Sequence, residues 1–203
     1  MKSLKIILFA AGVLIAGRGY SQSGGVQGIL ALSWEVSIPS SNNFLSKTST
    51  EGGRIEYRKM LNPRISAGLG LSWNSFQQYV SNKTYSKNGT AITTDMVRQI
   101  YTAPITAIFH YYPAVGNKAL KPYIGIGLGA QYAEQNAYLN VYEVSDYNWG
   151  FVARPEIGTL LRFNRAWAAL VTFSYNVSTN KNKTFNTSSL QQFGINVGIA
   201  GLF

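Results

Sequence analysis

The chain has 203 residues, of which 46% are hydrophobic and only 13% are charged, and it contains no cysteine. Water-soluble domains usually carry about 25% charged residues, so the composition argues against a domain that is covered by water on every side. The fold therefore forms without disulfides. The formal net charge of +10 is compatible with an anionic partner such as nucleic acid.

The first segment has the composition of a secretory signal peptide. Lys2 and Lys5 precede an apolar run over residues 6–16, and small and polar residues follow as far as Ser21. We predict that residues 1–21 are a signal peptide removed on export, and that residues 22–203 form one domain, because about 180 residues suit one domain. A buried N-terminal helix is the alternative.

From residue 30 onward, apolar and polar residues alternate with a period of two, the pattern of strands with two different faces. In the first such segment, 30–38, Leu32 and Trp34 alternate with Ser33 and Glu35. The segments that follow in chain order are 54–61, 64–74, 97–111, 123–135, 149–163, 167–177 and 193–203. The alternation therefore predicts eight antiparallel strands.

The connections between these segments alternate in length. The joins at 62–63, 113–121 and 164–165 are shorter, whereas those at 39–53, 75–95, 134–148 and 178–189 are longer and rich in Ser, Asn, Thr and Lys. Short turns on one side and long loops on the other are typical of outer-membrane β-barrels, whose termini lie on the short-turn, periplasmic side. The sequence predicts an all-β, eight-stranded antiparallel transmembrane barrel of the up-and-down type.

A secreted antiparallel sandwich is the main alternative to the barrel. The face opposite the apolar residues carries Gly, Ser, Thr, Asn, Arg and Glu, which suit a narrow barrel interior, whereas a sandwich core needs large apolar side chains. A closed barrel also leaves no unpaired strand edge in lipid. Aromatic residues near the strand ends favour girdles at the two membrane interfaces. The predicted girdle residues are Trp34, Trp73, Tyr101, Phe109, Tyr111, Tyr123, Trp149, Phe163, Trp167 and Phe203.

Three segments resemble small outer-membrane barrels of the OmpX/OmpA-like superfamily, particularly Bacteroidetes-type proteins with an outer membrane protein beta-barrel domain. Residues 193–203, ending at Phe203, look like the C-terminal assembly signal of such barrels. Residues 56–76, with Asn62 and Pro63 between two strands, and the glycine-rich residues 121–130 are similar to other parts of them. The resemblance implies the outer membrane of a Gram-negative bacterium, contact with its lipids and lipopolysaccharide, and recognition of the Phe203 strand by the barrel-assembly machinery.

The distribution of charge does not indicate nucleic acid. Charges balance in the long loops, and part of the excess lies at the predicted periplasmic rim, in Lys59, Arg64, Lys118, Lys121 and Arg165. The interior of an eight-stranded barrel is just wide enough for side chains to fill, and charges buried there must pair. We predict that a charge network fills the lumen, made of Glu35, Arg54, Glu56, Arg58, Arg98, Arg154, Glu156 and Arg162.

Residues suited to catalysis are few. The only histidine, His110, is predicted to face the lumen near the periplasmic turn, far from the outer leaflet where lipid A-modifying enzymes act. No second histidine or cysteine is present to build a metal site with it. Gly125, Gly127 and Gly129 lie on a predicted strand with no helix after it, unlike a nucleotide-binding loop. We expect no catalytic residue, metal or cofactor.

The sequence favours a non-enzymatic barrel with a lumen plugged by side chains and a structural or surface-interaction role. The long loops carry aromatic residues that could anchor a surface protein or a glycan, namely Tyr79, Tyr85, Tyr138, Tyr142, Tyr147 and Phe185. A narrow channel for small solutes or ions is one alternative. An enzyme that modifies lipid A is a less favoured one.

Overall fold

The computed structural model describes residues 26–40, 44–87, 90–113, 119–139 and 142–203, with the side chains of 82, 83 and 85–92 left out. The predicted signal peptide, residues 1–21, and the rim residue Lys118 lie outside these ranges. Within them, no helix is long and apolar enough to cross a membrane.

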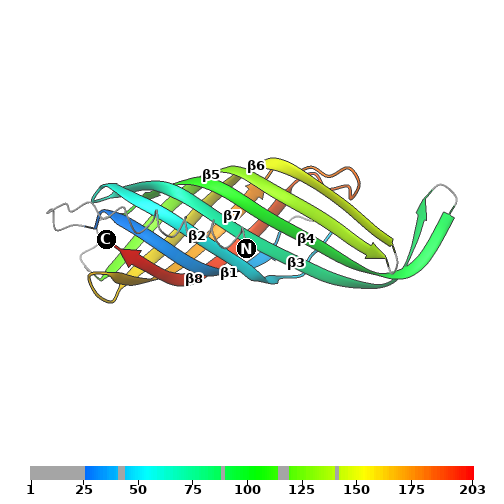
Figure 1. Cartoon of the computed structure of the whole chain (residues 1–203), viewed down its shortest axis with the longest axis horizontal. Coiled ribbons are helices and arrows are strands. Elements are labelled where there is room, and N and C mark those ends of the chain that lie inside the picture. Colours follow the sequence, from blue (N-terminus) through cyan, green and yellow to red (C-terminus); the bar gives the residue numbers. More distant parts are fainter. Residues whose placement is uncertain (1–25, 41–43, 88–89, 114–118, 140–141) are drawn as a thin grey trace, which may run out of the picture.

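Eight strands form a closed barrel in which each strand pairs with its neighbours in the sequence and the first strand pairs with the last (Figure 1). All pairs are antiparallel, which confirms the predicted eight-stranded up-and-down barrel. The strands are β1 (Gly28–Pro39), β2 (Ser49–Asn62), β3 (Ile65–Lys87), β4 (Thr90–Tyr111), β5 (Leu120–Leu139), β6 (Tyr142–Arg162), β7 (Trp167–Ser178) and β8 (Leu190–Leu202).

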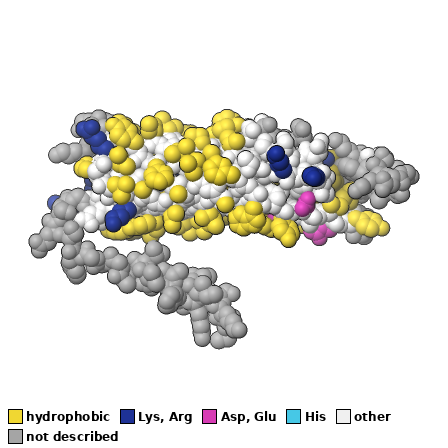
Figure 2. Space-filling view, turned by 90° about the horizontal axis from the view of Figure 1, so that it is seen from above, with side chains coloured by type: hydrophobic (Ala, Val, Ile, Leu, Met, Phe, Trp, Pro, Cys, Tyr) yellow, Lys and Arg dark blue, Asp and Glu magenta, His cyan; other side chains and the backbone are white. Residues whose placement is uncertain are grey.

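Apolar side chains cover the outside of the barrel and polar side chains fill much of its inside. In β1, Leu32 and Trp34 are more than half exposed, whereas Ser33 and Glu35 between them are buried, because successive side chains of a strand point to opposite faces. Figure 2 shows the resulting broad band of hydrophobic side chains on the wall. This arrangement is the reverse of a secreted sandwich, so that alternative is wrong.

The four central strands are much longer than the alternation predicted. Strands β3 to β6 have 23, 22, 20 and 21 residues, whereas the other four have between 12 and 14. The predicted loops 75–95 and 134–148 are therefore mostly strand, and of the four predicted long loops only those after β1 and β7 remain largely as connections between strands. We call the outer part of these four strands the extension, residues 75–87, 90–101, 134–139 and 142–148; Figure 1 shows it projecting from the end opposite the C-terminus.

Two buried apolar clusters close the interior at its two ends. The first, at the short-turn end, consists of Ile29, Ala31, Tyr112, Tyr123, Leu160, Ala168, Leu170, Ala200 and Leu202. The second, beneath the extension, consists of Phe44, Leu45, Phe76, Met96, Ile100, Ala133, Ala137 and Leu190. Because Phe44 and Leu45 belong to the β1–β2 connection, that connection folds over the inner face of the extension rather than away from it. The polar part of the lumen lies between the two clusters.

Candidate functional site

Six buried charged residues meet inside the barrel. Alternate positions of a strand share one face, so β2 and β6 each direct more than one charge inward, and a barrel of this size brings side chains from opposite walls into contact. The six side chains come from β1, β2 and β6, and each residue is at most 6% exposed: Glu35, Arg54, Glu56, Arg58, Arg154 and Glu156.

Glu156 lies at the centre of this network. Its Oε2 atom is 2.6 Å from Arg54 Nη1 and 3.5 Å from Arg154 Nε, while its Oε1 atom contacts His110 Nε2. The carboxylate on β6 thus joins side chains of β2, β4 and β6. Arg54 continues the network, because its Nη2 atom is 2.9 Å from Glu56 Oε2.

Glu35 ends the network on the side nearer the extension. Arg154 Nη2 donates to Glu35 Oε2 at 2.9 Å and to Asn196 Oδ1 at 2.8 Å. Asn196 Nδ2 donates to the same carboxylate oxygen at 2.8 Å, and Asn74 Nδ2 donates to the other at 3.2 Å. The Ser37 hydroxyl also donates to Oε1, at 3.0 Å. Glu35 is therefore held by one guanidinium, two amides and one hydroxyl, which replace the water it has lost.

Arg58 ends the network on the short-turn side. It pairs with Glu56 and donates to the hydroxyls of Tyr112 and Tyr123 at 3.2 Å each. Its guanidinium also lies 4.5 Å from the ring centroid of Tyr123, a cation–π contact. Tyr112 and Tyr123 thus connect the charges to the apolar cluster below them.

The network balances its own charge, with three carboxylates against three guanidiniums. Burying ions is costly, and removing one partner from a buried pair typically destabilises a protein by about 3–5 kcal/mol, because the other charge remains without compensation. Removing any one of the six charged side chains should therefore destabilise the barrel.

Gly125 makes the contact between His110 and Glu156 possible. It lies between them in the sheet, paired with His110 on β4 and with Glu156 on β6. A Cβ atom at Gly125 would lie 2.3 Å from His110 Cδ2, so a side chain there would displace the ring. The glycine-rich stretch of β5 serves packing inside the wall at this position.

Two of the eight predicted network residues lie elsewhere. Arg98 lies on the inner face of the extension, where its Nη1 atom donates to the Phe44 carbonyl at 2.8 Å and its guanidinium is 5.1 Å from the Phe44 ring centroid. Arg162 lies half-buried at the short-turn mouth, beside Lys121. Both face inward as predicted, but at heights along the barrel that the carboxylates do not reach. The prediction that they join the network is wrong.

Nine of the ten predicted girdle residues point outward. Tyr123 is the exception, because it is only 1% exposed and its hydroxyl lies 2.6 Å from Thr172 Oγ1 inside the lumen. Assigning it to the girdle was wrong, since it shares the inward face of β5 with Gly125. The outward-facing residues are Trp34, Trp73, Tyr101, Phe109, Tyr111, Trp149, Phe163, Trp167 and Phe203. Their position at the membrane interfaces stays a prediction.

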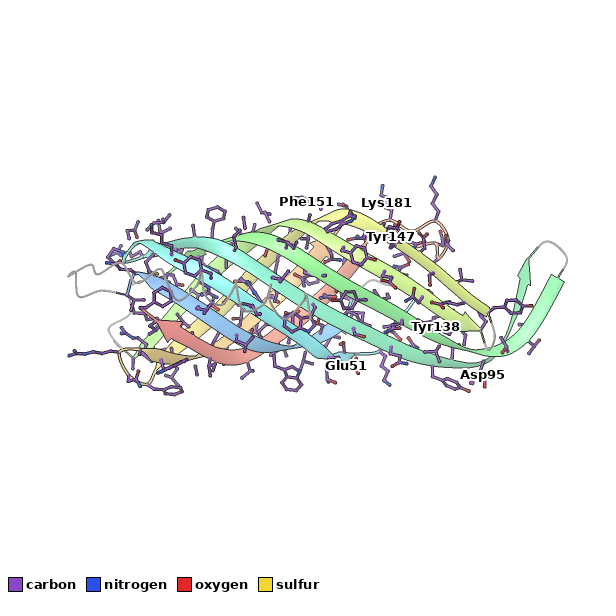
Figure 3. All side chains as sticks on the ribbon, viewed as in Figure 1. Glu51, Asp95, Tyr138, Tyr147, Phe151 and Lys181 are labelled. Atoms are coloured by element: carbon purple, nitrogen blue, oxygen red, sulfur yellow. The ribbon has the colours of Figure 1, made fainter. Side chains whose placement is uncertain are left out.

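The predicted loop aromatics lie on strands of the extension, with one exception. Tyr79, Tyr142 and Tyr147 are between 60% and 69% exposed, and Tyr138 is half-buried. Figure 3 labels Tyr138 and Tyr147 at the extended end of the molecule. The backbone of Tyr85 belongs to β3, but its side chain lies outside the described ones.

Phe185 is the exception. It lies in the β7–β8 connection and packs on Phe44, with ring centroids 4.7 Å apart. It is half-buried against the cluster beneath the extension. Phe185 therefore helps to hold two connections together, and the prediction that it is an exposed anchor is wrong.

The outer face of the extension combines these aromatic residues with carboxylates. Tyr79, Val97, Tyr138 and Glu143 lie in one row across the four strands. Tyr79 donates to Asp95 Oδ2 at 2.7 Å, and this hydrogen bond raises the pKa of the exposed Tyr79 phenol above its ordinary value.

A second carboxylate of this face is held in the same way. Glu134 accepts from the Tyr132 hydroxyl at 3.1 Å and from Asn136 Nδ2 at 3.0 Å. The extension therefore presents fixed acceptors beside flat rings. In the part of the chain that the structure describes, no group of three His, Cys, Asp or Glu gathers as a metal site would require.

Comparisons with known proteins agree with this architecture. Among solved structures, the chain is similar to that of Ail, the attachment invasion locus protein of Yersinia pestis. That structure was determined in complex with the heparin analogue sucrose octasulfate. The TM-score is 0.54 at 12% identity, over 88% of this chain and 99% of that one. It is also similar to Neisserial surface protein A (NspA), with a TM-score of 0.56 at 16% identity, over 89% of this chain and 98% of that one. These likenesses concern the fold alone.

Sequence comparison supplies the family. No curated protein matches the chain significantly. The family model of the outer membrane protein beta-barrel domain matches residues 6–200, nearly the whole chain. The expected location in the outer membrane of a Gram-negative bacterium is thereby confirmed, and lipid and lipopolysaccharide form the surroundings of the wall. The chain belongs to the outer membrane protein beta-barrel domain family.

Proposed function

We propose that this protein is a closed, non-conducting outer-membrane barrel without enzymatic activity, which acts structurally or through its extracellular extension. The observation that carries the proposal is the filling of the lumen by the paired charges and the two apolar clusters. The short-turn end is the periplasmic end in this assignment, and the extension is extracellular.

The small size of two interior cavities supports a plugged lumen. One cavity, of about 10 Å³, lies beneath the extension between Thr102, Leu190 and Gln192. Another, of about 20 Å³, lies at the periplasmic mouth. A water molecule needs roughly 10–15 Å³ of such space, so neither cavity accommodates a hydrated ion or a solute. A narrow channel would require the buried side chains of Arg58 and Arg154 to move aside.

Single-channel recording in planar bilayers tests the plug. We expect the wild-type protein to insert without discrete conductance steps. A double variant, Glu35→Ala with Arg154→Ala, removes one buried carboxylate together with its guanidinium, and we expect it to open a measurable leak. Steady ion conductance by the wild-type protein would overturn the plugged lumen and favour the channel.

The extension supports a role in surface interaction. Its outer face carries Asp95, Glu134 and Glu143, and none of its described outward side chains is a lysine or an arginine. Ail has been crystallised with a heparin analogue, but the carboxylates that Tyr79, Tyr132 and Asn136 hold in place favour a basic protein segment over a polyanion. We expect the immobilised protein to retain a lysine-rich peptide and not heparin. The double variant Glu134→Gln with Glu143→Gln should retain less of the peptide. Preferential binding of heparin would contradict this.

The environment of His110 supports a non-enzymatic role. Its ring is buried, contacts Glu156 and lies toward the periplasmic end, away from the outer leaflet. Mass spectrometry of lipid A from cells with and without the gene tests this. We expect identical lipid A, and a changed acylation pattern would favour the enzyme.

The C-terminal strand supports recognition by the barrel-assembly machinery. In β8, Phe193, Ile195, Val197 and Ile199 are exposed on one face, and Phe203 after it is 60% exposed. We expect Phe203→Ala to lower the amount of folded protein in the membrane, as measured by the heat-dependent shift on SDS gels. Equal amounts for both forms would argue against the assignment.

A further inference from the structure

Two cations without a carboxylate partner converge at the periplasmic mouth of the barrel. Lys121 on β5 pairs with Leu160 on β6, so Arg162, two residues beyond Leu160, is its diagonal neighbour on the same inward face. Diagonal neighbours of this kind have Cα atoms about 7–8 Å apart, within reach of long side chains. The side chains of Lys121 and Arg162 line the same pocket. Neither forms an ion pair or side-chain hydrogen bond within the described residues.

No acidic side chain of this protein lies near enough to neutralise them. All eight Asp and Glu residues of the sequence are among the described residues. Three belong to the lumen network: Glu35, Glu56 and Glu156. The other five lie toward the extracellular end: Glu51, Asp95, Glu134, Glu143 and Asp146. No carboxylate side chain of the described residues pairs with Lys121 or Arg162, so a compensating anion would come from outside the protein.

The cations stand over a small apolar pocket. Its walls include Ile29, Met60, Leu160 and Leu202, and Lys121 and Arg162 line it together with them. The pocket measures only about 20 Å³, too little for an acyl chain, since one water alone needs roughly 10–15 Å³. A ligand therefore places its charged group at the mouth and leaves the rest of the molecule outside.

The surrounding rim favours an anion at this mouth. Lys59, Arg64 and Arg165 are exposed at the same end, and Figure 2 shows Lys and Arg there without Asp or Glu on the visible face. Charges of one sign around an opening raise the local concentration of counter-ions. An arginine fork matches two oxygens of a planar or tetrahedral anion, and a lysine adds a point charge. A phosphate group, which carries one negative charge in a diester and up to two in a monoester, suits this pair.

We propose that Lys121 and Arg162 form a phosphate-binding site at the periplasmic mouth of the barrel. The phosphate belongs either to the headgroup of an anionic phospholipid, reached over the rim, or to a soluble phosphate compound of the periplasm. The site does not depend on whether the lumen conducts or on what the extension binds.

Two probes distinguish the two sources. Pyrophosphate is titrated by calorimetry into the protein folded in an uncharged detergent. In parallel, phosphatidylglycerol bound to protein in mixed phosphatidylcholine nanodiscs is quantified after removal of loosely associated lipid. Binding of pyrophosphate identifies a site for soluble phosphates, and enrichment of phosphatidylglycerol alone identifies a lipid headgroup site; both results support the proposal.

The double variant Lys121→Gln with Arg162→Gln tests the residues. It removes two charge-assisted hydrogen bonds, and we expect binding of the active probe to weaken about tenfold or more. The matched control is Lys59→Gln with Arg165→Gln, which removes the same charge from the exposed rim and should weaken binding less than about threefold, by long-range attraction alone. Lys121→Arg should retain binding. The heat-dependent gel shift shows that each variant is folded.

The proposal is overturned if neither probe binds the wild-type protein. It is also overturned if both double variants weaken binding equally, because the rim as a whole would then act as a diffuse anion attractor.

Discussion

The barrel wall and the extension are built from the same strands, yet their side chains follow different rules. In the wall, Leu69, Leu71 and Trp73 of β3 point outward between small inward residues. In the extension, the same strand carries Gln77 and Tyr79 on its outer face and Phe76 on its inner one. Lipid outside the wall forces strict alternation of apolar and polar residues, whereas water outside the extension removes that requirement. Removing one of the buried charges of the wall should therefore destabilise the protein more than removing one of the exposed charges of the extension.

The largest expected contrast concerns one glutamate in each region. We expect Glu156→Leu to destabilise the barrel by about 3–5 kcal/mol, since three buried guanidiniums would then face only two carboxylates and one buried charge would stay uncompensated. The matched change in the extension, Glu134→Leu, should cost less than about 1 kcal/mol, because its partners Tyr132 and Asn136 are neutral and no buried charge is left uncompensated. Urea unfolding in detergent micelles measures both. Equal losses would mean that the lumen network contributes no more than surface contacts do.

The next prediction separates the stability of the two regions. Phe44 is 6% exposed. Truncating it in Phe44→Ala should lower the stability of the cluster beneath the extension by about 3 kcal/mol. We expect faster amide hydrogen exchange in the outer parts of β3 to β6, with unchanged exchange in the barrel wall. The control is Tyr142→Ala, which removes an aromatic ring that is 64% exposed and should leave both regions unchanged. Faster exchange throughout the wall would show that the two regions unfold together.

A smaller effect is expected from the glycines of β5. Gly125→Ala places a Cβ atom 2.3 Å from His110 Cδ2, whereas at Gly127 the nearest atom would be 3.4 Å away. We expect Gly125→Ala to cost about 1–3 kcal/mol, the usual range for overpacking, and Gly127→Ala to cost little. Unfolding midpoints of the two variants provide the measurement. A Gly127→Ala protein that is the less stable of the two would contradict the packing of His110 against Gly125.

The smallest effect concerns the ionisation of Tyr79. Its hydrogen bond to Asp95 favours the protonated phenol, so its pKa is raised. We expect Asp95→Asn to lower this pKa toward the ordinary value, which means that Tyr79 deprotonates at a lower pH in the variant. Spectroscopic titration of the difference between wild-type protein and Tyr79→Phe isolates this signal. An unchanged titration would show that the two side chains do not interact in solution.

Alternation in the sequence predicted which face a side chain occupies, but not its height along the barrel. It placed Glu56, Arg58 and Glu156 inside, because a period of two is a local property of each strand. The height at which charges from different strands come into contact depends on the stagger between those strands. The residue pattern of one strand does not show this stagger. Arg98 and Arg162 therefore share the correct face and still lie away from the network.

Two further errors have different physical origins. Tyr123 has the parity of Gly125, so the alternation itself indicates an inward side chain; its aromatic ring at a strand end suggested the girdle instead. Most of the extension is predicted as loops, because its hydrophobic alternation fades where water replaces lipid. Its Thr, Tyr and Val residues, common in strands, were the available signal, as in residues 90–101 of β4.

The most direct measurement uses the absence of cysteine from the chain. Two single variants, Ser72→Cys and Ser145→Cys, introduce a thiol at a buried lumen position and at an exposed position of the extension. The protein is reconstituted in liposomes and treated with a small, charged, thiol-specific reagent. We predict rapid modification of Ser145→Cys and modification of Ser72→Cys only after unfolding, because the side-chain plug excludes the reagent. Similar rates at the two positions in the folded protein would contradict a lumen closed by its own side chains.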